Sequence, residues 1–433
     1  MRDQQCLLVW GCAALLALGC RKDKPSDPPT VRILQPGAGY SVAVPDTIAV
    51  SVSVSDDRLV ERVTVLVADP NGVPLTPAVT ASVQAGSATV ALDLPVLDEA
   101  IATGSYVLTA IASDGQADAR AFLGITVQAA PLRVRAMYLL PPVDGAGPYP
   151  VTRRDSAGGL ALFTTLSELG GAALAGSTLF THGALTGPLQ RWDLGTAAGS
   201  VLVQNPGPGA GGQLYFNGLA ADPADGRVYV GTSDGLVRGF APNGPQLFNG
   251  ATPAGFVSES TVVVGAFLVS AVVNPVTQQR ALVQHGYASG AVFAQFPSAV
   301  DPVALFAIDD QRLLLMGNAP AGAVIREVNV QLGGSSTVRE FPGQVLRCAA
   351  RASPDRFILA LSTGVSRFDR AANAVVPLAP GLDANALAYD PVAGTVAAAV
   401  GATVQPLDPV SGMLGPSWTA PHPVGAILLQ LNR

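Results

Sequence analysis

Residues 218–240, GLAADPADGRVYVGTSDGLVRGF, carry a pattern that returns at residues 386–407, ALAYDPVAGTVAAAVGATVQPL. In both stretches an apolar run leads into a polar turn that begins Asp-Pro, and a second apolar run follows the turn. Arg227 and Thr395 open the second run of each stretch and are 168 residues apart, which is four times 42. Self-similarity at a fixed period of this length predicts a repeat architecture.

Three further copies fit between these two stretches. They are VVNPVTQQRALVQHG (272–286), FAIDDQRLLLMGN (306–318) and ARASPDRFILALSTG (350–364). An arginine stands in the same turn, before a run of at least three apolar residues, at Arg227, Arg280, Arg312 and Arg356. Each unit is therefore predicted to contain a strand, a polar turn, a second strand, a turn with glycine and a third strand.

Residues 131–433 hold about seven units of this length, which predicts an all-β fold with the four-stranded blades of a β-propeller. The expected units are 131–165 joined by 424–433, then units that begin near residues 166, 217, 260, 302, 344 and 384. The last segment, VGAILLQLNR, matches only the start of a unit. We therefore expect it to complete the first blade and close the ring, which removes open sheet edges. Six or eight blades stay open as alternatives.

One stretch suggests the kind of propeller. Residues 222–235, DPADGRVYVGTSDG, resemble the repeat of YVTN/quinoprotein-like propellers. The WD-repeat signature requires a terminal Trp-Asp in each blade, and only Trp192-Asp193 occurs. Quinone-cofactor propellers repeat a tryptophan docking motif, which three tryptophans in the whole chain cannot supply, so no cofactor is expected.

A separate domain is expected at residues 30–129, where strand-like runs follow at short intervals. In TIAVSVSVSD (47–56) the apolar residues Ile48, Val50, Val52 and Val54 alternate with smaller ones, as in a half-buried strand. About seven strands in a hundred residues is typical of an immunoglobulin-like sandwich. SVSVSDDRLVERVTVLV (51–67) and GSYVLTAIASDG (104–115) resemble bacterial Ig-like repeats. That resemblance implies that Tyr106 packs its ring in the core and bonds a backbone group through its hydroxyl.

The N-terminal residues predict where in the cell the protein is located. Residues 1–19 are expected to be a signal peptide, because the thirteen apolar residues 6–18 match a signal core and are too few to cross a bilayer. Ala17-Leu18-Gly19-Cys20 resembles the lipobox of bacterial lipoproteins, which implies cleavage before Cys20 and its acylation with chains such as palmitate. Each buried methylene then contributes about 0.8 kcal/mol to membrane anchoring. A secreted protein with an incidental cysteine is the alternative.

Residues 20–29 would then form the lipidated N-terminus and a polar, proline-stiffened linker. Arg21, rather than aspartate, follows the cysteine, so the resemblance implies the outer membrane; the periplasmic and surface sides both stay open. After cleavage Cys348 is the one remaining free thiol, and we expect it to be a small buried residue on a strand.

Composition excludes some partners. The net charge is −6, and no cluster of Lys and Arg gives the footprint of a nucleic-acid binder. Apolar residues make up 49% of the chain, and 47 glycines and 35 prolines occur without period. This composition favours a turn-rich β protein over disorder, because disorder requires low hydrophobicity.

The three histidines, His182, His285 and His422, are candidates for a metal site. His182 and His285 each precede a glycine at what reads as the same repeat position, and equivalent positions of a propeller lie on a ring. Turn histidines are nevertheless the favoured interpretation, because no carboxylate recurs beside them. His422 stands near the C-terminus.

Acidic residues also indicate no site. Four glutamates fall at unlike places in the repeat: Glu168, Glu259, Glu327 and Glu340. Three aspartates of the first domain suggest calcium by analogy with cadherin-like modules: Asp56, Asp57 and Asp114. Turn aspartates are favoured, because no second cluster at ligand spacing accompanies them. The glycine-rich 207–212 precedes a strand-like run and is expected to be a loop, not a phosphate-binding loop.

The sequence thus predicts a lipid-anchored binding or scaffolding protein of the cell envelope, whose propeller docks a protein, peptide or glycan. We expect no catalytic residue and no metal. The alternative is a propeller enzyme, such as a lactonase- or lyase-like hydrolase, whose site residues are too dispersed to recognise.

Overall fold

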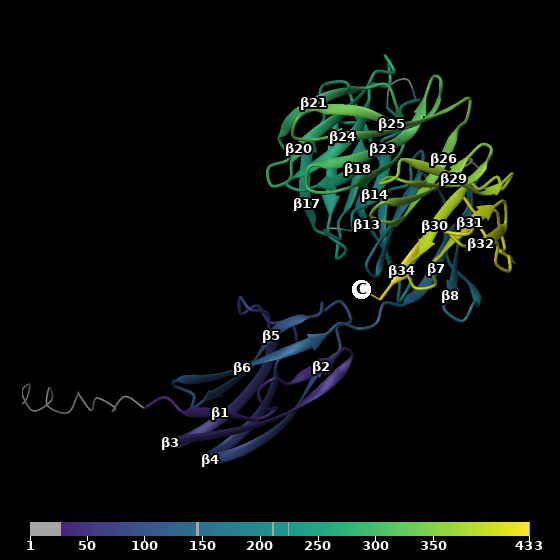
Figure 1. The fold of residues 1–433 in the computed structure, drawn as a ribbon. Helices are drawn as coiled ribbons and strands as arrows, with labels where there is room; N and C mark the ends of the chain where they lie inside the picture. Colours follow the sequence, from purple (N-terminus) through teal and green to yellow (C-terminus); the bar gives the residue numbers. More distant parts are fainter. Residues whose placement is uncertain (1–26, 144–146, 210–211, 224, 433) are drawn as a thin grey trace, which may run out of the picture. The chain divides into compact units, whose positions relative to one another are not determined.

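The computed structural model describes residues 27–143, 147–209, 212–223 and 225–432 (Figure 1). The chain divides into two compact units, one that ends at Pro131 and one from Leu132 to Asn432. Strands build both units, and no α-helix occurs in the ranges just given. Accordingly, no helix within them is long and apolar enough to cross a membrane.

The first unit contains six strands. They are β1 (Thr30–Gln35), β2 (Ser41–Ala43), β3 (Asp46–Ala68), β4 (Val79–Val96), β5 (Gly104–Ser113) and β6 (Asp118–Gln128). They pair in the order β1-β3-β5-β6-β2, and β4 also pairs with β3. The first half of β3 pairs with β1 and the second half with β5, so one long strand contributes to both layers of the sandwich.

The expected count of about seven strands differs from the six observed because β3 and β4 each join two of the expected runs, whereas β2 was not expected. The runs 47–56 and 60–69 are both part of β3, whose register with β4 shifts between Ser55 and Val60 instead of breaking. The expected alternation is confirmed: Ile48, Val50, Val52 and Val54 are at most 2% exposed. Tyr106 packs against this core and donates its hydroxyl to the Ala102 carbonyl at 2.9 Å, as the resemblance implied.

The second unit consists of seven four-stranded antiparallel sheets, which confirms the seven-bladed propeller. Blade 1 is β10 (Gly171–Ala175), β11 (Thr178–His182), β12 (Leu189–Asp193) and β13 (Gly199–Val203). Blade 2 is β14 (Phe216–Ala221), β15 (Val228–Thr232), β16 (Leu236–Phe240) and β17 (Gln246–Ala251). Blade 3 is β18 (Val257–Val264), β19 (Phe267–Val273), β20 (Arg280–Gly286) and β21 (Val292–Ser298).

The remaining blades follow the same plan. Blade 4 is β22 (Asp301–Ala307), β23 (Arg312–Ala319), β24 (Gly322–Asn329) and β25 (Gly334–Pro342). Blade 5 is β26 (Leu346–Ser353), β27 (Arg356–Leu361), β28 (Gly364–Asp369) and β29 (Ala374–Pro380). Blade 6 is β30 (Ala386–Asp390), β31 (Thr395–Val400), β32 (Thr403–Leu407) and β33 (Trp418–Thr419). The closing blade is β34 (Ala426–Leu431), β7 (Val134–Leu140), β8 (Tyr149–Asp155) and β9 (Leu160–Leu166).

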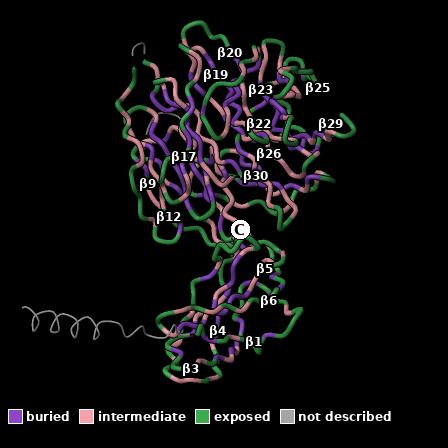
Figure 2. Tube along the Cα trace, turned by 90° about the vertical axis from the view of Figure 1, so that its left-hand side faces the viewer, coloured by how far each residue is buried: buried purple, intermediate pink, exposed green. Residues whose placement is uncertain are grey.

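The inner strands form the ring. Each of β10, β14, β18, β22, β26 and β30 contacts the inner strand of the next blade, and β34 contacts both β30 and β10. The C-terminal β34 pairs with β7, with Ala426 opposite Leu140, so the expected closure of the ring by the last strand, in the closing blade, is confirmed (Figure 1). Buried segments run through the blades, and the loops at their ends are exposed (Figure 2).

The Asp-Pro turn of the repeat also joins neighbouring blades. In blade 2, Asp222 is 6% exposed and accepts a hydrogen bond from the Val263 amide of blade 3 at 2.7 Å. In the same turn, Asp225 accepts the hydroxyls of Tyr229 at 2.5 Å and of Tyr287, from blade 3, at 2.6 Å. These residues of the repeat are therefore structural.

One copy of the repeat was assigned to the wrong strands. The turns that begin at Asp222 and Asp390 join the first and second strands of their blades, but the turn that begins at Asn274 joins the second and third, β19 and β20. The first hairpin of blade 3 instead closes tightly between Val264 and Phe267. Arg280 consequently opens a third strand, whereas Arg312 and Arg356 open second strands.

Candidate functional site

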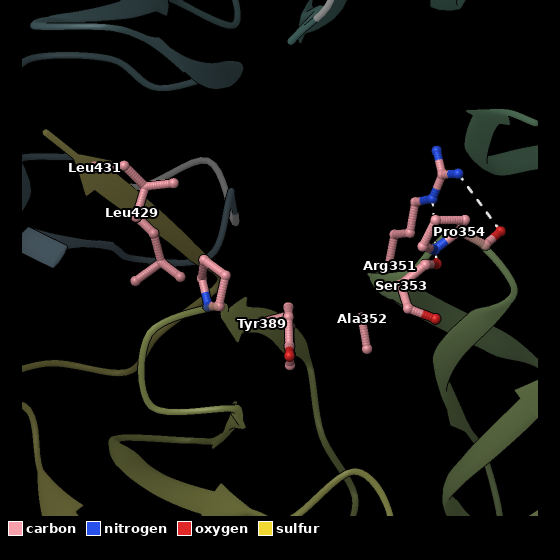
Figure 3. A pocket seen from close by; sticks show the side chains of 8 residues that line it. Arg351, Ala352, Ser353, Pro354, Tyr389, Leu429 and Leu431 are labelled. Carbon is pink, nitrogen blue, oxygen red and sulfur yellow. Dashed lines mark hydrogen bonds between the residues drawn. The ribbon is translucent and has the colours of Figure 1, made fainter. Parts of the chain in front are cut away.

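A cavity of about 370 Å³ lies where the inner strands of blades 5, 6 and the closing blade end (Figure 3). Its lining includes Arg351, Pro354, Tyr389, Pro391, Leu429 and Leu431. The inner strands of a propeller surround its central channel, so the ends of three consecutive ones mark a mouth of that channel. We call this cavity the channel-mouth pocket.

Arg351 forms the polar side of the pocket. Its Nη1 donates to the Ala307 carbonyl of β22 at 2.7 Å, its Nε to the Ser353 carbonyl at 3.3 Å and its Nη2 to the Pro354 carbonyl at 3.4 Å. The guanidinium carbon also lies 5.8 Å from the centre of the Phe357 ring. The side chain is thus held in place, and it links the inner strands of blades 4 and 5.

Burial lowers the pKa of Arg351, and the charge of Arg370 acts in the same direction, whereas Asp355 opposes it. The guanidinium remains protonated, because the ordinary pKa of arginine is so high. The pocket therefore contains a partly desolvated positive charge.

The opposite side of the pocket is apolar. Leu429 and Leu431 of β34 stand across the pocket from Arg351, and Tyr389 lies between the two sides (Figure 3). The Tyr389 hydroxyl makes no hydrogen bond to any residue of the described chain. The pocket can accordingly hold a ligand with a polar end, an apolar body and a group that bonds a phenol.

The histidines do not converge on a metal. His182 ends β11, a second strand, and His285 lies in β20, a third strand, so the expectation of one shared repeat position was wrong. The cause is the tight first hairpin of blade 3. Because of it, the Asn-Pro turn joins the second and third strands, and His285 lies in the third strand instead of the second. His182 is 3% exposed and His285 fully buried, and burial lowers the pKa of both. His422 contacts the Thr152 hydroxyl through Nε2 at 3.0 Å.

The four glutamates occupy unlike places, as expected. Glu168 accepts bonds from a turn of blade 1, Glu259 pairs with Arg280, Glu327 pairs with Arg312, and Glu340 lies exposed in β25. In the described part of the chain, no group of three or more His, Cys, Asp or Glu residues is placed to hold a metal ion.

The remaining candidates are structural where the chain is described. Asp114 accepts the Gln116 and Ala117 amides within its turn. Cys348 lies on β26, half-buried, and burial raises its pKa to about 12. Residues 207–209 of the glycine-rich segment lie in the loop between β13 and β14. Cys20 lies outside the described residues.

One catalytic spacing escaped the sequence analysis. Residues 231–235, GTSDG, have the Gly-x-Ser-x-Gly spacing of a nucleophile elbow. In the structure they form the hairpin turn between β15 and β16, whereas an elbow requires a strand followed by a helix. Ser233 therefore lacks the placement of a nucleophile.

Sequence reasoning also missed Arg351. It singled out Arg356 in the same copy because only that arginine recurs in the repeat. A usable signal was present, since Arg351 interrupts the small residues Ala349, Ala350 and Ala352 of a predicted inner strand. A single large cation among alanines at the end of an inner strand points toward the channel mouth.

Comparisons with known proteins bear on the first unit. A family model described as a bacterial Ig domain matches residues 29–114, which contain β1 to β5. No curated protein matches the chain. Among solved structures, a protein from Lactobacillus plantarum is 16% identical, over 69% of this chain and 99% of its own, with a TM-score of 0.48. A similarity at that score supports no argument about this chain.

Proposed function

We propose that the chain is a lipid-anchored binding protein of the bacterial cell envelope, whose propeller presents the channel-mouth pocket to a partner. The observation that carries the proposal is the pocket itself, because three blades contribute its lining. A site built from several blades exists only in the closed ring, so ligand binding is tied to the folded propeller.

Binding, rather than catalysis, is what the pocket residues support. Its lining combines a cation held by backbone carbonyls, a phenol, two leucines and two prolines. None of the three histidines and none of Glu168, Glu259, Glu327 and Glu340 belongs to that lining. Histidine and carboxylates are the groups that most often carry out general acid–base chemistry, and Tyr389 is the one titratable group here besides Arg351.

The anchor is supported by the N-terminal sequence alone. The apolar run 6–18, the lipobox-like Ala17–Cys20 and the polar segment after it imply attachment to the outer membrane through lipid on Cys20. Cys20→Ser should abolish metabolic labelling with a fatty acid and release the protein from the membrane fraction. Unchanged labelling and partitioning of this variant would contradict the anchor.

Photo-crosslinking in living cells tests the binding function. A photoreactive residue at Pro391, an exposed residue of the pocket lining, should yield a specific envelope partner. The matched control places the same residue at Val345, which is 51% exposed and precedes the other end of an inner strand. No crosslinked partner at position 391, or the same products from both positions, would refute the proposal.

A further inference from the structure

The positive charge of Arg351 has no anionic partner in direct contact. All three of its hydrogen bonds end on carbonyl oxygens, and no ion pair joins it to a carboxylate of the described residues. Asp355 is the carboxylate whose charge acts on it, but Arg370 already holds that carboxylate, with its Nε at 2.8 Å and its Nη2 at 2.6 Å.

The guanidinium of Arg351 is also held in one orientation, and some of its N–H groups make no hydrogen bond. A guanidinium has five N–H groups, and three are engaged here, one on each nitrogen. One N–H on each terminal nitrogen therefore remains for a ligand. The carbonyls and the Phe357 ring already restrict the side chain, so little further conformational entropy is lost when an anion binds.

The apolar side of the pocket defines the rest of the ligand. Leu429 and Leu431 offer aliphatic surface across from Arg351, and Tyr389 can donate or accept one hydrogen bond between them. A volume of about 370 Å³ is near the lower end of the range for small-molecule sites. The pocket thus suits a short apolar chain that ends in an anion.

We infer that the channel-mouth pocket binds a carboxylate at the end of an apolar chain, with the carboxylate on Arg351 and the chain against Leu429 and Leu431. This inference rests on the proposed function, because it names the group by which a partner is held. A planar carboxylate fits the paired N–H groups of a guanidinium better than a spherical anion does. Both a free fatty acid and the C-terminal end of a polypeptide supply this chemistry.

Calorimetric titration tests the inference on the full chain with Cys20→Ser, in buffer without detergent. Octanoate should bind saturably, and octanamide, which lacks the charge, should bind at least about tenfold more weakly. N-acetyl-leucine and its amide form a second pair that represents a peptide end. Tighter binding of N-acetyl-leucine than of octanoate assigns the site to peptide ends, and the reverse order assigns it to fatty acids.

Two variants separate the ligand role of Arg351 from its structural role. Arg351→Gln should weaken octanoate binding about tenfold or more. Leu429→Glu should weaken it as well, although Arg351 is intact, because the new carboxylate repels the carboxylate of octanoate. Arg367→Gln is the matched control, because Arg367 also donates to a carbonyl of the next blade, that of Val410 at 2.8 Å, but lies outside the pocket. It should bind octanoate like the parent.

The inference is overturned if neither octanoate nor N-acetyl-leucine shows saturable binding at millimolar concentration, or if each amide binds as well as its acid. It is also overturned if Arg351→Gln and Leu429→Glu both bind octanoate like the parent. The envelope partner is tested separately by crosslinking at position 391, so a failure here leaves that result standing and the two failures can be told apart.

Discussion

Glu168 lies between β9 and β10, and its carboxylate accepts four hydrogen bonds from the turn between β11 and β12. Its Oε2 accepts the amides of Leu185 at 2.8 Å, Thr186 at 2.8 Å and Gly187 at 2.9 Å, and its Oε1 accepts the Thr186 hydroxyl at 2.5 Å. Desolvation on its own would raise the pKa of Glu168, but these bonds outweigh it and hold the pKa at about 2. The carboxylate is therefore a structural tie within blade 1.

Glu168→Gln should lower the free energy of unfolding at pH 7 by about 1 kcal/mol, a value discounted for solvent exposure. Because the folded pKa is below the unfolded value of 4.5, this stabilisation is present above pH 4.5 and is lost as the pH falls toward 2. Denaturant titrations at several pH values should show the parent and the variant converging in that window. Glu340→Gln, at an exposed position, should match the parent throughout; a constant difference between Glu168→Gln and the parent would contradict the assignment.

At the scale of elements, one type of turn recurs between strands. An Asp or Asn side chain accepts backbone amides two and three residues ahead, and the amide four residues ahead bonds its carbonyl. This geometry begins at Asp193, Asn274, Asn329, Asp390 and Asp408. The residue that ends the turn has a positive φ, which favours glycine.

This turn explains which elements could be predicted. Its leading Asp or Asn marks a hairpin; the fifth residue is glycine in three of the five turns, whereas Ala197 and Gln278 end the other two. The pattern does not state which hairpin of a blade it closes, because the local backbone is the same in each position. The turn after Asn274 joins second and third strands, and for that reason Arg280 and His285 were placed one strand too far inward.

Ala197 and Gly394 form a matched test of this turn. Both end it with positive φ, 56° for Ala197 and 67° for Gly394. Ala197→Gly should raise the free energy of unfolding, and Gly394→Ala should lower it, each by about 1 kcal/mol. A Cβ at Gly394 meets nothing within 4 Å, so its effect reports backbone strain alone. Thermal or denaturant unfolding gives both values, and changes of the same sign would refute the explanation.

At the scale of the whole molecule, the period of 42 residues made the seven blades and their closure predictable, because every blade repeats the same pattern of strands. The channel-mouth pocket could not be predicted in this way. Arg351 and Tyr389 lie opposite equivalent second-strand residues, Phe357 and Val396, but the residue type differs from blade to blade, so no periodic signal marks the pocket. The residues that line it come together only when the inner strands stand side by side.

Deletion of residues 424–433 tests the closure. It removes β34, leaving β7 without its inner partner and a gap between β30 and β10. The propeller should lose cooperative unfolding in calorimetry, whereas the first unit, which has its own core, should keep its transition. Deletion of the polar segment 21–26 is the control and should change neither transition. An unchanged propeller transition after the first deletion would show that the ring does not depend on β34.

The pairing of β34 with β7 also means that the closing blade can be completed only after the last strand has been synthesised. The Arg133 amide donates to the Asn432 side-chain oxygen at 2.8 Å, although the two residues are 299 positions apart. Ribosomes release the chain from its N-terminus, so β7 is made long before the strand that covers it. During this interval the closing blade has an exposed edge at β7. The last strand to be made thereby removes an edge that would otherwise be open to pairing with another chain.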